Sequence, residues 1–193
     1  MAGKKQDLLD HAFAALLSDD DAKVLAAIAY VQERGDARAI MPLLHALART
    51  CDQHRQQKIH ELLYQVKVKD AAAELVKALD EPELRMVRQT VIATFWNAGL
   101  DAAPHTEKLV ACAVEGTAEE CFECLTVLEN QEVLPEKAVL QGIKLVNAAI
   151  ASNTDEYKGV MLGSLLVELN APAGKDWTLP RSLDHPDQCS GRS

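Results

Sequence analysis

The sequence is poor in aromatic residues, although almost half of it is apolar. Only 4% of the 193 residues are Phe, Trp or Tyr, whereas 48% are hydrophobic, with many Ala and Leu among them. Such side chains suit closely spaced helices, while β-sandwiches and barrels depend on aromatic and β-branched residues. The composition therefore predicts an all-α protein.

Positive charge is also scarce. The chain has 20 Lys and Arg against 29 Asp and Glu, so its formal net charge is −9. A general nucleic-acid binder needs clustered Lys and Arg to displace counterions from phosphates. We therefore expect no nucleic acid among the partners of this protein.

Long apolar runs and a paired set of cysteines are missing as well. The longest apolar run, Val24 to Val31, falls far short of the roughly 20 residues that span a bilayer. The start, MAGKKQDLLD, has two lysines but no apolar segment behind them. Five cysteines is an odd number, which argues against a disulfide framework. We expect a protein that neither enters a membrane nor is exported, with a cytoplasmic localisation.

A helical pattern organises the rest of the chain, and its clearest copy is the segment from Asp21 to Leu47. The apolar residues of its first half follow the i, i+3, i+4, i+7 spacing of one helical face. They are Val24, Ala27, Ile28 and Val31, and the second half repeats the spacing with Ile40, Leu43, Leu44 and Leu47. Between the halves, we expect Gly35 to adopt the left-handed conformation that ends a helix and Asp36 to cap the next one. The segment is predicted to be helix, tight turn, helix.

The same pattern recurs along the chain at a regular period. The last apolar position of the second helix falls at Leu16, Leu47, Leu79, Ala113 and Ile143, which are 31, 32, 34 and 30 residues apart. A two-helix unit with this period is the signature of an α-solenoid. The sequence thus predicts about five stacked helical hairpins. The segment from Lys4 to Leu17 is predicted to be a lone helix that caps the first of them.

Three stretches resemble a known family. They are VLAAIAYVQERGDARAIMPLLHAL, the Val87-Arg88 pair after Asp80-Glu81-Pro82, and Gly99 with Asp101. They resemble the short bacterial type of HEAT repeats, whose relatives include the phycobilisome-lyase-like repeats. The resemblance covers about residues 21–170 and implies a right-handed α-solenoid that binds other proteins.

The composition divides the chain into two parts. Residues 1–170 are predicted to form the repeat domain with its capping helix. Residues 171–193 are rich in Pro, Gly, Ser and Asp and lack a helical period, so a mostly disordered tail is predicted. Trp177 and Leu179 are bulky apolar residues of this tail that could pack on the last hairpin.

Two motifs look chemical but have simpler readings. Cys121 and Cys124 have the spacing of a zinc or redox pair, yet both fall on core positions of the repeat, where cysteine serves as a small hydrophobe. The His60-Glu61 pair is similar to those of di-iron HEAT hydroxylases, which need several such pairs, whereas this chain has one. We interpret His60 as a solvated histidine. No metal, cofactor or enzymatic activity is predicted.

Arg88 is the exception in the apolar stripes of the first helices, because it occupies a position that is otherwise hydrophobic. A buried guanidinium needs a carboxylate or several carbonyls. In HEAT-like families an arginine after valine commonly ties adjacent repeats together. We expect Arg88 to do the same, with Asp70 or Asp101 as its partner.

The leading functional hypothesis is a non-enzymatic scaffold that binds a protein partner on its concave face. Positions about 140 to 200° from the apolar stripe of the second helices point to solvent. The predicted binding residues are Arg38, His45, Arg49, Lys77, Lys108 and Gln141, with Trp96 on the flank of the third repeat as a further candidate. An ordinary solvated face is the simpler explanation of each.

Charge patterning and two other function classes complete the prediction. Glu115 to Glu136 contains seven glutamates and no Lys or Arg, a polarity that could steer a partner. The main alternative is a lyase-like HEAT protein whose groove handles a tetrapyrrole chromophore and its client protein. A HEAT-like DNA glycosylase would need a basic concave face, which the acidic composition opposes.

Overall fold

The computed structural model of the chain describes residues 2–171, and side chains from Gln6 onward. This part is all-helical, as predicted. Its α-helices are α1 (Ala2–Leu16), α2 (Asp21–Arg34), α3 (Ile40–Arg49), α4 (Gln53–Tyr64), α5 (Ala71–Ala78), α6 (Arg88–Asn97), α7 (Thr106–Glu115), α8 (Ala118–Glu129), α9 (Glu136–Ser152) and α10 (Glu156–Leu169). Short 3-10 helices are η1 (Ala37–Ala39), η2 (Pro82–Val87) and η3 (Ala103–His105). No helix within residues 2–171 is long and apolar enough to cross a membrane.

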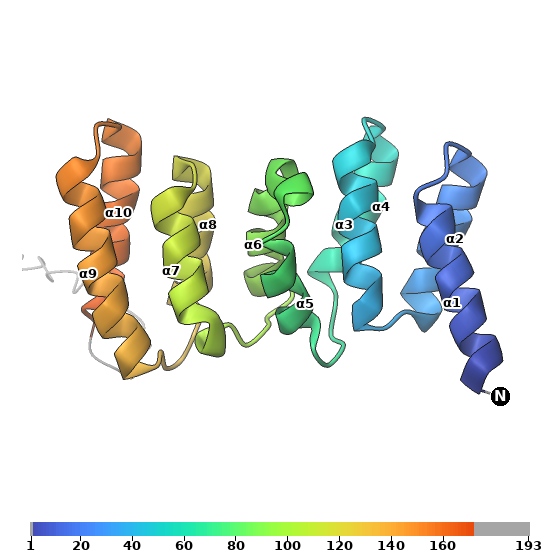
Figure 1. Cartoon of the computed structure of the whole chain (residues 1–193), viewed down its shortest axis with the longest axis horizontal. Helices are drawn as coiled ribbons and strands as arrows, with labels where there is room; N and C mark the ends of the chain where they lie inside the picture. Colours follow the sequence, from blue (N-terminus) through green and yellow to red (C-terminus); the bar gives the residue numbers. More distant parts are fainter. Residues whose placement is uncertain (1, 172–193) are drawn as a thin grey trace, which may run out of the picture.

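The ten described helices pack in sequential pairs, which form five layers in a line (Figure 1). Layer 1 is α1 with α2, and each later layer follows in chain order up to α9 with α10 in layer 5. The odd-numbered helices form one row and the even-numbered helices form a second row behind it (Figure 1). This arrangement is a repeat-like helical array, as the period of the sequence indicated.

The pairing of the helices differs from the prediction. The sequence predicted that α2 and α3 would form one hairpin, with α1 as a lone cap. Instead, α1 packs along α2 and α3 packs on α4, whereas α2 and α3 share little contact. The apolar stripes show which face of a helix is buried but not which neighbour covers it. The turn at Gly35-Asp36 therefore connects two layers rather than the two helices of one layer.

The conformation of Gly35 also corrects the prediction. Its φ of −64° and ψ of 159° are extended, not left-handed. A Cβ atom at this position would lie 2.5 Å from the carbonyl oxygen of Val31. Glycine is therefore needed here, because only a residue without a side chain lets the backbone pass so close to this carbonyl. Asp36 caps as expected, because its Oδ1 accepts a hydrogen bond of 3.1 Å from the Arg38 amide. Gly99, with φ of 62°, provides the left-handed end of α6.

The predicted apolar stripes form one continuous core from Ala12 to Leu169. Side chains such as Leu44, Ile59, Leu75 and Leu109 are fully buried. In α9 the buried residues are Ala138, Gly142 and Val146, whereas Ile143, which the period of the sequence placed in the core, is only partly buried.

Arg88 ties α6 to α8, but its partner is neither of the two predicted aspartates. Its guanidinium donates two hydrogen bonds to Glu120, from Nε to Oε1 at 3.1 Å and from Nη2 to Oε2 at 2.8 Å. Asp70 and Asp101 are exposed on connections between layers. The inter-repeat role of Arg88 is confirmed, and the partner is corrected to Glu120.

Candidate functional site

The predicted binding residues of the second helices lie along the odd row. Arg38, Arg49, Lys77 and Gln141 are exposed, whereas His45 and Lys108 are partly buried. They occupy η1 or α3, α5, α7 and α9, so the structure distributes them over layers 2 to 5 rather than in one cluster. Their positions along one row follow the prediction, and their role in binding stays a prediction.

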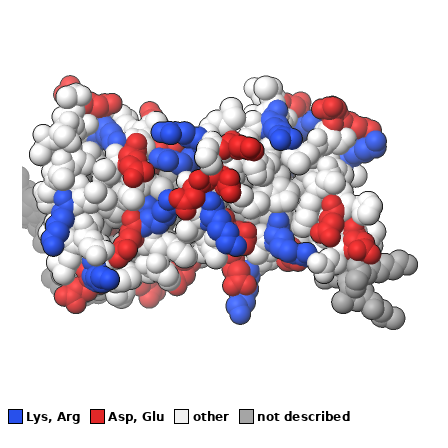
Figure 2. All heavy atoms as spheres, in the orientation of Figure 1, with Lys and Arg blue, Asp and Glu red and all other residues white. Residues whose placement is uncertain are grey.

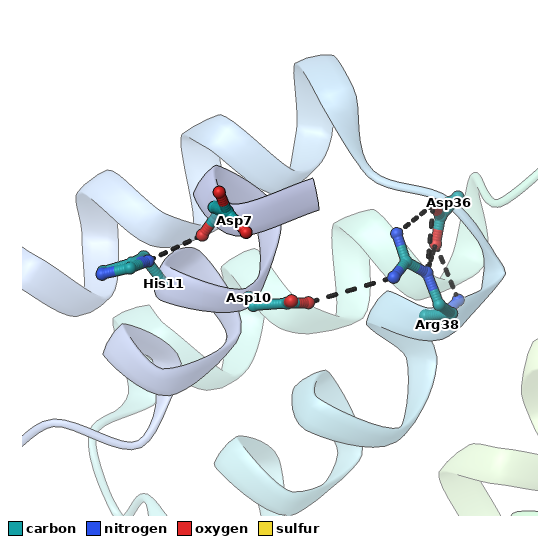
Figure 3. A network of polar contacts seen from close by, with 5 residues as sticks. All are labelled: Asp7, Asp10, His11, Asp36 and Arg38. Carbon is teal, nitrogen blue, oxygen red and sulfur yellow. Dashed lines mark hydrogen bonds and ion pairs between the residues drawn. The ribbon is translucent and has the colours of Figure 1, made fainter. Parts of the chain in front are cut away.

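Arg38 is held by carboxylates of its own surface (Figure 3). Its Nη2 lies 2.9 Å from Asp36 Oδ2, and its Nη1 lies 3.9 Å from Asp10 Oδ1 on α1. The hydrogen bonds that the Arg38 guanidinium donates to Asp36, followed by the negative charge of that carboxylate, raise the pKa of Arg38. The guanidinium thus lies beside carboxylates of α1 and of the connection before α3, and much of its charge is compensated locally.

Three more of the predicted binding residues have similar partners. Lys77 Nζ lies 2.6 Å from Glu74 Oε1. The Lys108 ammonium forms an ion pair with Asp80, and His45 Nδ1 lies 3.9 Å from Glu83 Oε2. Figure 2 accordingly shows blue and red side chains intermixed over the face of the odd row. This face is not a continuous basic patch.

Trp96 sits on the even row and is held in a defined orientation. It is 40% exposed, and its indole Nε1 donates a hydrogen bond of 2.9 Å to Glu123 Oε2 on α8. Gln89, two turns earlier on α6, donates to the other oxygen of the same carboxylate at 3.2 Å. The carboxylate therefore connects α6 with α8 and fixes a large aromatic ring at the surface.

A hollow of about 510 Å³ adjoins Trp96. It lies between the connection from α6 to α7 and the connection from α8 to α9. Its lining includes Trp96, Asp101, Glu132 and Val133. Gln131 braces the two connections, because its Oε1 accepts a hydrogen bond of 2.8 Å from the Ala102 amide. We name the residues Trp96, Asp101, Glu123, Glu132 and Val133 the Trp96 surface.

Besides Asp101, the charge of this surface comes from the acidic run of the sequence, which supplies Glu123 and Glu132. Among the seven glutamates of that run, Glu120 is buried against Arg88, whereas Glu119, Glu129 and Glu132 are exposed. Phe122, which the sequence analysis did not single out, is 49% exposed on α8. The sequence signal for Phe122 was its position between Cys121 and Cys124 but outside the buried stripe to which these two cysteines belong. The part of the even row formed by α8 is therefore acidic and aromatic.

His60 is not the solvated residue that was predicted. Its ring stacks on Tyr64 of the same helix, with centroids 5.6 Å apart and an interplanar angle of 12°. Its Nε2 lies 3.4 Å from the hydroxyl of Thr90 on α6. Burial lowers the pKa of His60. The ring fills space between α4 and α6, which the sequence pattern of a single helix does not reveal.

The cysteines of α7 and α8 are core residues. Cys121 and Cys124 have no exposed surface, and Cys112 is nearly as buried. Burial raises the pKa of Cys121 to about 11 and that of Cys124 well above its usual value. The predicted core register is confirmed. Within residues 2–171, no group of three or more His, Cys, Asp or Glu is arranged to hold a metal ion.

Comparisons with protein-family models, with curated proteins and with solved structures find no match to this chain.

Proposed function

We propose that this protein is a non-enzymatic scaffold that binds a partner protein through the Trp96 surface. The observation that carries the proposal is the fixed, partly exposed indole of Trp96 beside a hollow with Asp101 and Glu132 in its lining. Tryptophan is among the residues that dominate binding energy at interfaces. A ring that is already held by Glu123 loses little conformational entropy when a partner covers it.

The surface favours a basic partner segment. Lys or Arg stacks on a tryptophan face, and the nearby carboxylates attract the same side chains. The exposed glutamates of α8 extend this negative field and would accelerate encounter with a positively charged partner. The partner that fits is therefore a segment with Lys or Arg next to an apolar side chain.

This proposal moves the preferred surface from the odd row to the even row. The odd row was predicted from the orientation of basic residues. In the structure, four of those side chains lie beside carboxylates of the same face, which reduces their value for an acidic partner. The odd-row residues Arg38, His45, Arg49, Lys77, Lys108 and Gln141 remain the second candidate surface.

Membership of the HEAT family and a right-handed superhelix belong to the same proposal. They rest on the resemblance of the sequence and on the layered pairs of helices. The alternative, the handling of a tetrapyrrole, rests on the resemblance alone.

The test begins with selection of peptides from a random library that is displayed on phage, with the full-length protein as bait. Binding of the selected peptides is then measured by fluorescence titration at two salt concentrations. We expect the peptides to be rich in Lys or Arg. Trp96→Ala should weaken binding by about tenfold or more, because truncation of a hot-spot residue costs roughly 2 kcal/mol.

Two further variants separate the surfaces. Asp101→Asn with Glu132→Gln keeps the shape of the hollow and removes two charges, so it should weaken binding and reduce its salt dependence. Arg38→Glu with Arg49→Glu and Lys77→Glu changes the odd row and serves as the control. If the control abolishes binding while Trp96→Ala leaves it unchanged, the odd row is the binding surface and the proposal is wrong.

A further inference from the structure

The connections between successive layers follow one another along a single edge of the array, the lower edge in Figure 1. They link α2 to α3, α4 to α5, α6 to α7 and α8 to α9. Because each of them comes directly after an even-numbered helix, the C-terminal ends of these helices lie along the same edge. The last carbonyl groups of a helix carry partial negative charge. A recess between two neighbouring connections is therefore a place where a cation is stabilised.

One of these recesses already holds a cation of the chain itself. Lys67, on the connection from α4 to α5, donates a hydrogen bond from Nζ to the backbone carbonyl of Ala98, directly after α6. A Cβ at the neighbouring Gly99 would lie 3.5 Å from the same ammonium group. The fold thus places a positive charge between two successive connections, at the C-terminal end of an even-numbered helix.

The next recess along the edge is the hollow of about 510 Å³ that adjoins Trp96, and it has no such cation. None of the described residues that line it is Lys or Arg, and α8 has no basic residue in its last turn. Asp101 and Glu132 line it from two different connections. Neither carboxylate takes part in an ion pair among the described side chains. The hollow therefore carries negative charge that the described chain does not compensate.

The oxygen acceptors of the hollow belong to several separate groups. Asp101 is oriented by the Ala103 amide, which donates a hydrogen bond of 3.1 Å to its Oδ1. Asn130 donates from Nδ2 to the carbonyl of Thr126 at 2.7 Å, so its Oδ1 is the atom of this amide that can accept from a ligand. With the carboxylate of Glu132, the lining offers acceptors from two connections to a group with several donors.

Trp96 adds an aromatic wall to these acceptors. Its ring is held by the hydrogen bond from Nε1 to Glu123, and 40% of its surface is exposed. A guanidinium group is planar, stacks on aromatic faces and has five donors, whereas an ammonium group is compact and has three. A lining with one aromatic wall and several separate acceptors therefore matches a guanidinium group better than an ammonium group.

We propose that the hollow is the seat of one arginine side chain of a bound protein segment, with the guanidinium group against Trp96 and hydrogen-bonded to Asp101 and Glu132. This inference rests on the proposed function and narrows it, from a basic segment to a segment with arginine at one anchor position. The arginine takes the place in this recess that Lys67 takes in the preceding one.

The test uses the full-length protein, labelled with nitrogen-15, and three matched alanine peptides whose central residue is arginine, lysine or citrulline. Citrulline has nearly the shape of arginine but no charge. The indole Nε1–H resonance of Trp96 is identified by its loss in Trp96→Phe. We expect the arginine peptide to shift this resonance in a saturable manner. The lysine peptide should bind about threefold more weakly, and the citrulline peptide about tenfold more weakly or less.

Two double variants locate the seat. Asp101→Asn with Glu132→Gln should remove the preference for arginine over citrulline. Asp19→Asn with Glu33→Gln removes the same number of exposed charges from layer 1 and should leave the preference unchanged. Circular dichroism confirms that the helices persist in both, and the comparison of the three peptides on the wild type does not depend on the variants.

Several results would overturn the inference: lysine or citrulline binding as tightly as arginine, no shift with any peptide, or a preference for arginine that survives the loss of Asp101 and Glu132. Its failure is distinct from failure of the proposed function. Library peptides that bind at the Trp96 surface through lysine would refute the inference alone. An arginine peptide that binds in the hollow, while Trp96→Ala leaves the library peptides unaffected, would refute the proposed function alone.

Discussion

Arg88 and Glu120 form a two-point ion pair between neighbouring layers, and both side chains are nearly buried, with 12% and 10% of their surfaces exposed. Glu120 also closes a capping box at the start of α8. Its Oε2 accepts from the Thr117 amide at 3.0 Å, and its own amide donates to Thr117 Oγ1 at 3.2 Å. One carboxylate thus serves a helix end and an inter-layer contact.

We predict that Arg88→Met and Glu120→Met are each strongly destabilising and that the double variant is less so than their sum. Loss of one partner leaves a buried charge without its counterion, which costs about 3 to 5 kcal/mol. Chemical denaturation of the four proteins in the cycle measures the coupling, expected at about 0.5 to 3 kcal/mol. Additive effects of the two substitutions would show that the pair contributes no interaction energy.

Gly116→Ala should damage the same contact from the other side. The added Cβ would clash with Glu120 Oε2 and would lie 2.8 Å from Arg88 Nη2. Because φ of Gly116 is −80°, the cost arises from the clash and not from backbone strain. We expect a loss of roughly 1 to 3 kcal/mol in the free energy of unfolding. The loss should be smaller in the double Met background, although the Cys112 carbonyl oxygen, 2.7 Å from the Cβ, still crowds the site.

The cysteines should differ sharply in reactivity. Cys51 is exposed, whereas Cys112, Cys121 and Cys124 are buried. A thiol with a pKa of about 11 is ionised in about one molecule in a thousand at pH 8. Labelling with a maleimide, followed by peptide mapping, should therefore modify Cys51 rapidly and Cys121 only after unfolding. Equal labelling rates at both positions in the native protein would contradict the buried site.

Stability should fall on mild acidification because of His60. Burial lowers the pKa of this residue in the folded state, so the unfolded chain takes up a proton first as the pH falls through about 6.5. The contribution of His60 to the free energy of unfolding is then full above that pH and declines below it. Denaturation of the wild type and of His60→Phe at pH 7.5 and 5.5 tests this. The variant, which retains a ring beside Tyr64, should lose less stability over this interval.

The repeat period and most core residues could be predicted from the sequence, because burial of one helical face is a local property. Leu44 and Val24 are buried at the positions that the spacing indicated. The partners of those faces could not be predicted. The pairing of α1 with α2 and the Arg88–Glu120 contact depend on how layers stack, across 32 residues of sequence in the second case.

The candidate site, too, could be predicted from the sequence only in part. Exposure of Trp96 followed from its register at the edge of the stripe. Its fixation by Glu123, and the hollow bounded by Asp101 and Glu132, come from two connections that are brought together by packing. Phe122 was visible in the sequence as an aromatic residue off the core stripe, and the structure shows that it is 49% exposed.

Layers 3 and 4 contact each other mainly through the even row, so their junction should be mechanically weaker on the side of the odd row. Helix α5 has only eight residues and shares little contact with α7, whereas α6 and α8 pack extensively in the even row. The ion pair of Lys108 with Asp80 is a tie across the odd-row side of this junction. Two layers that are joined along one edge can open about that edge as a hinge. Backbone amides of α5 should therefore exchange with deuterium sooner than those of α6.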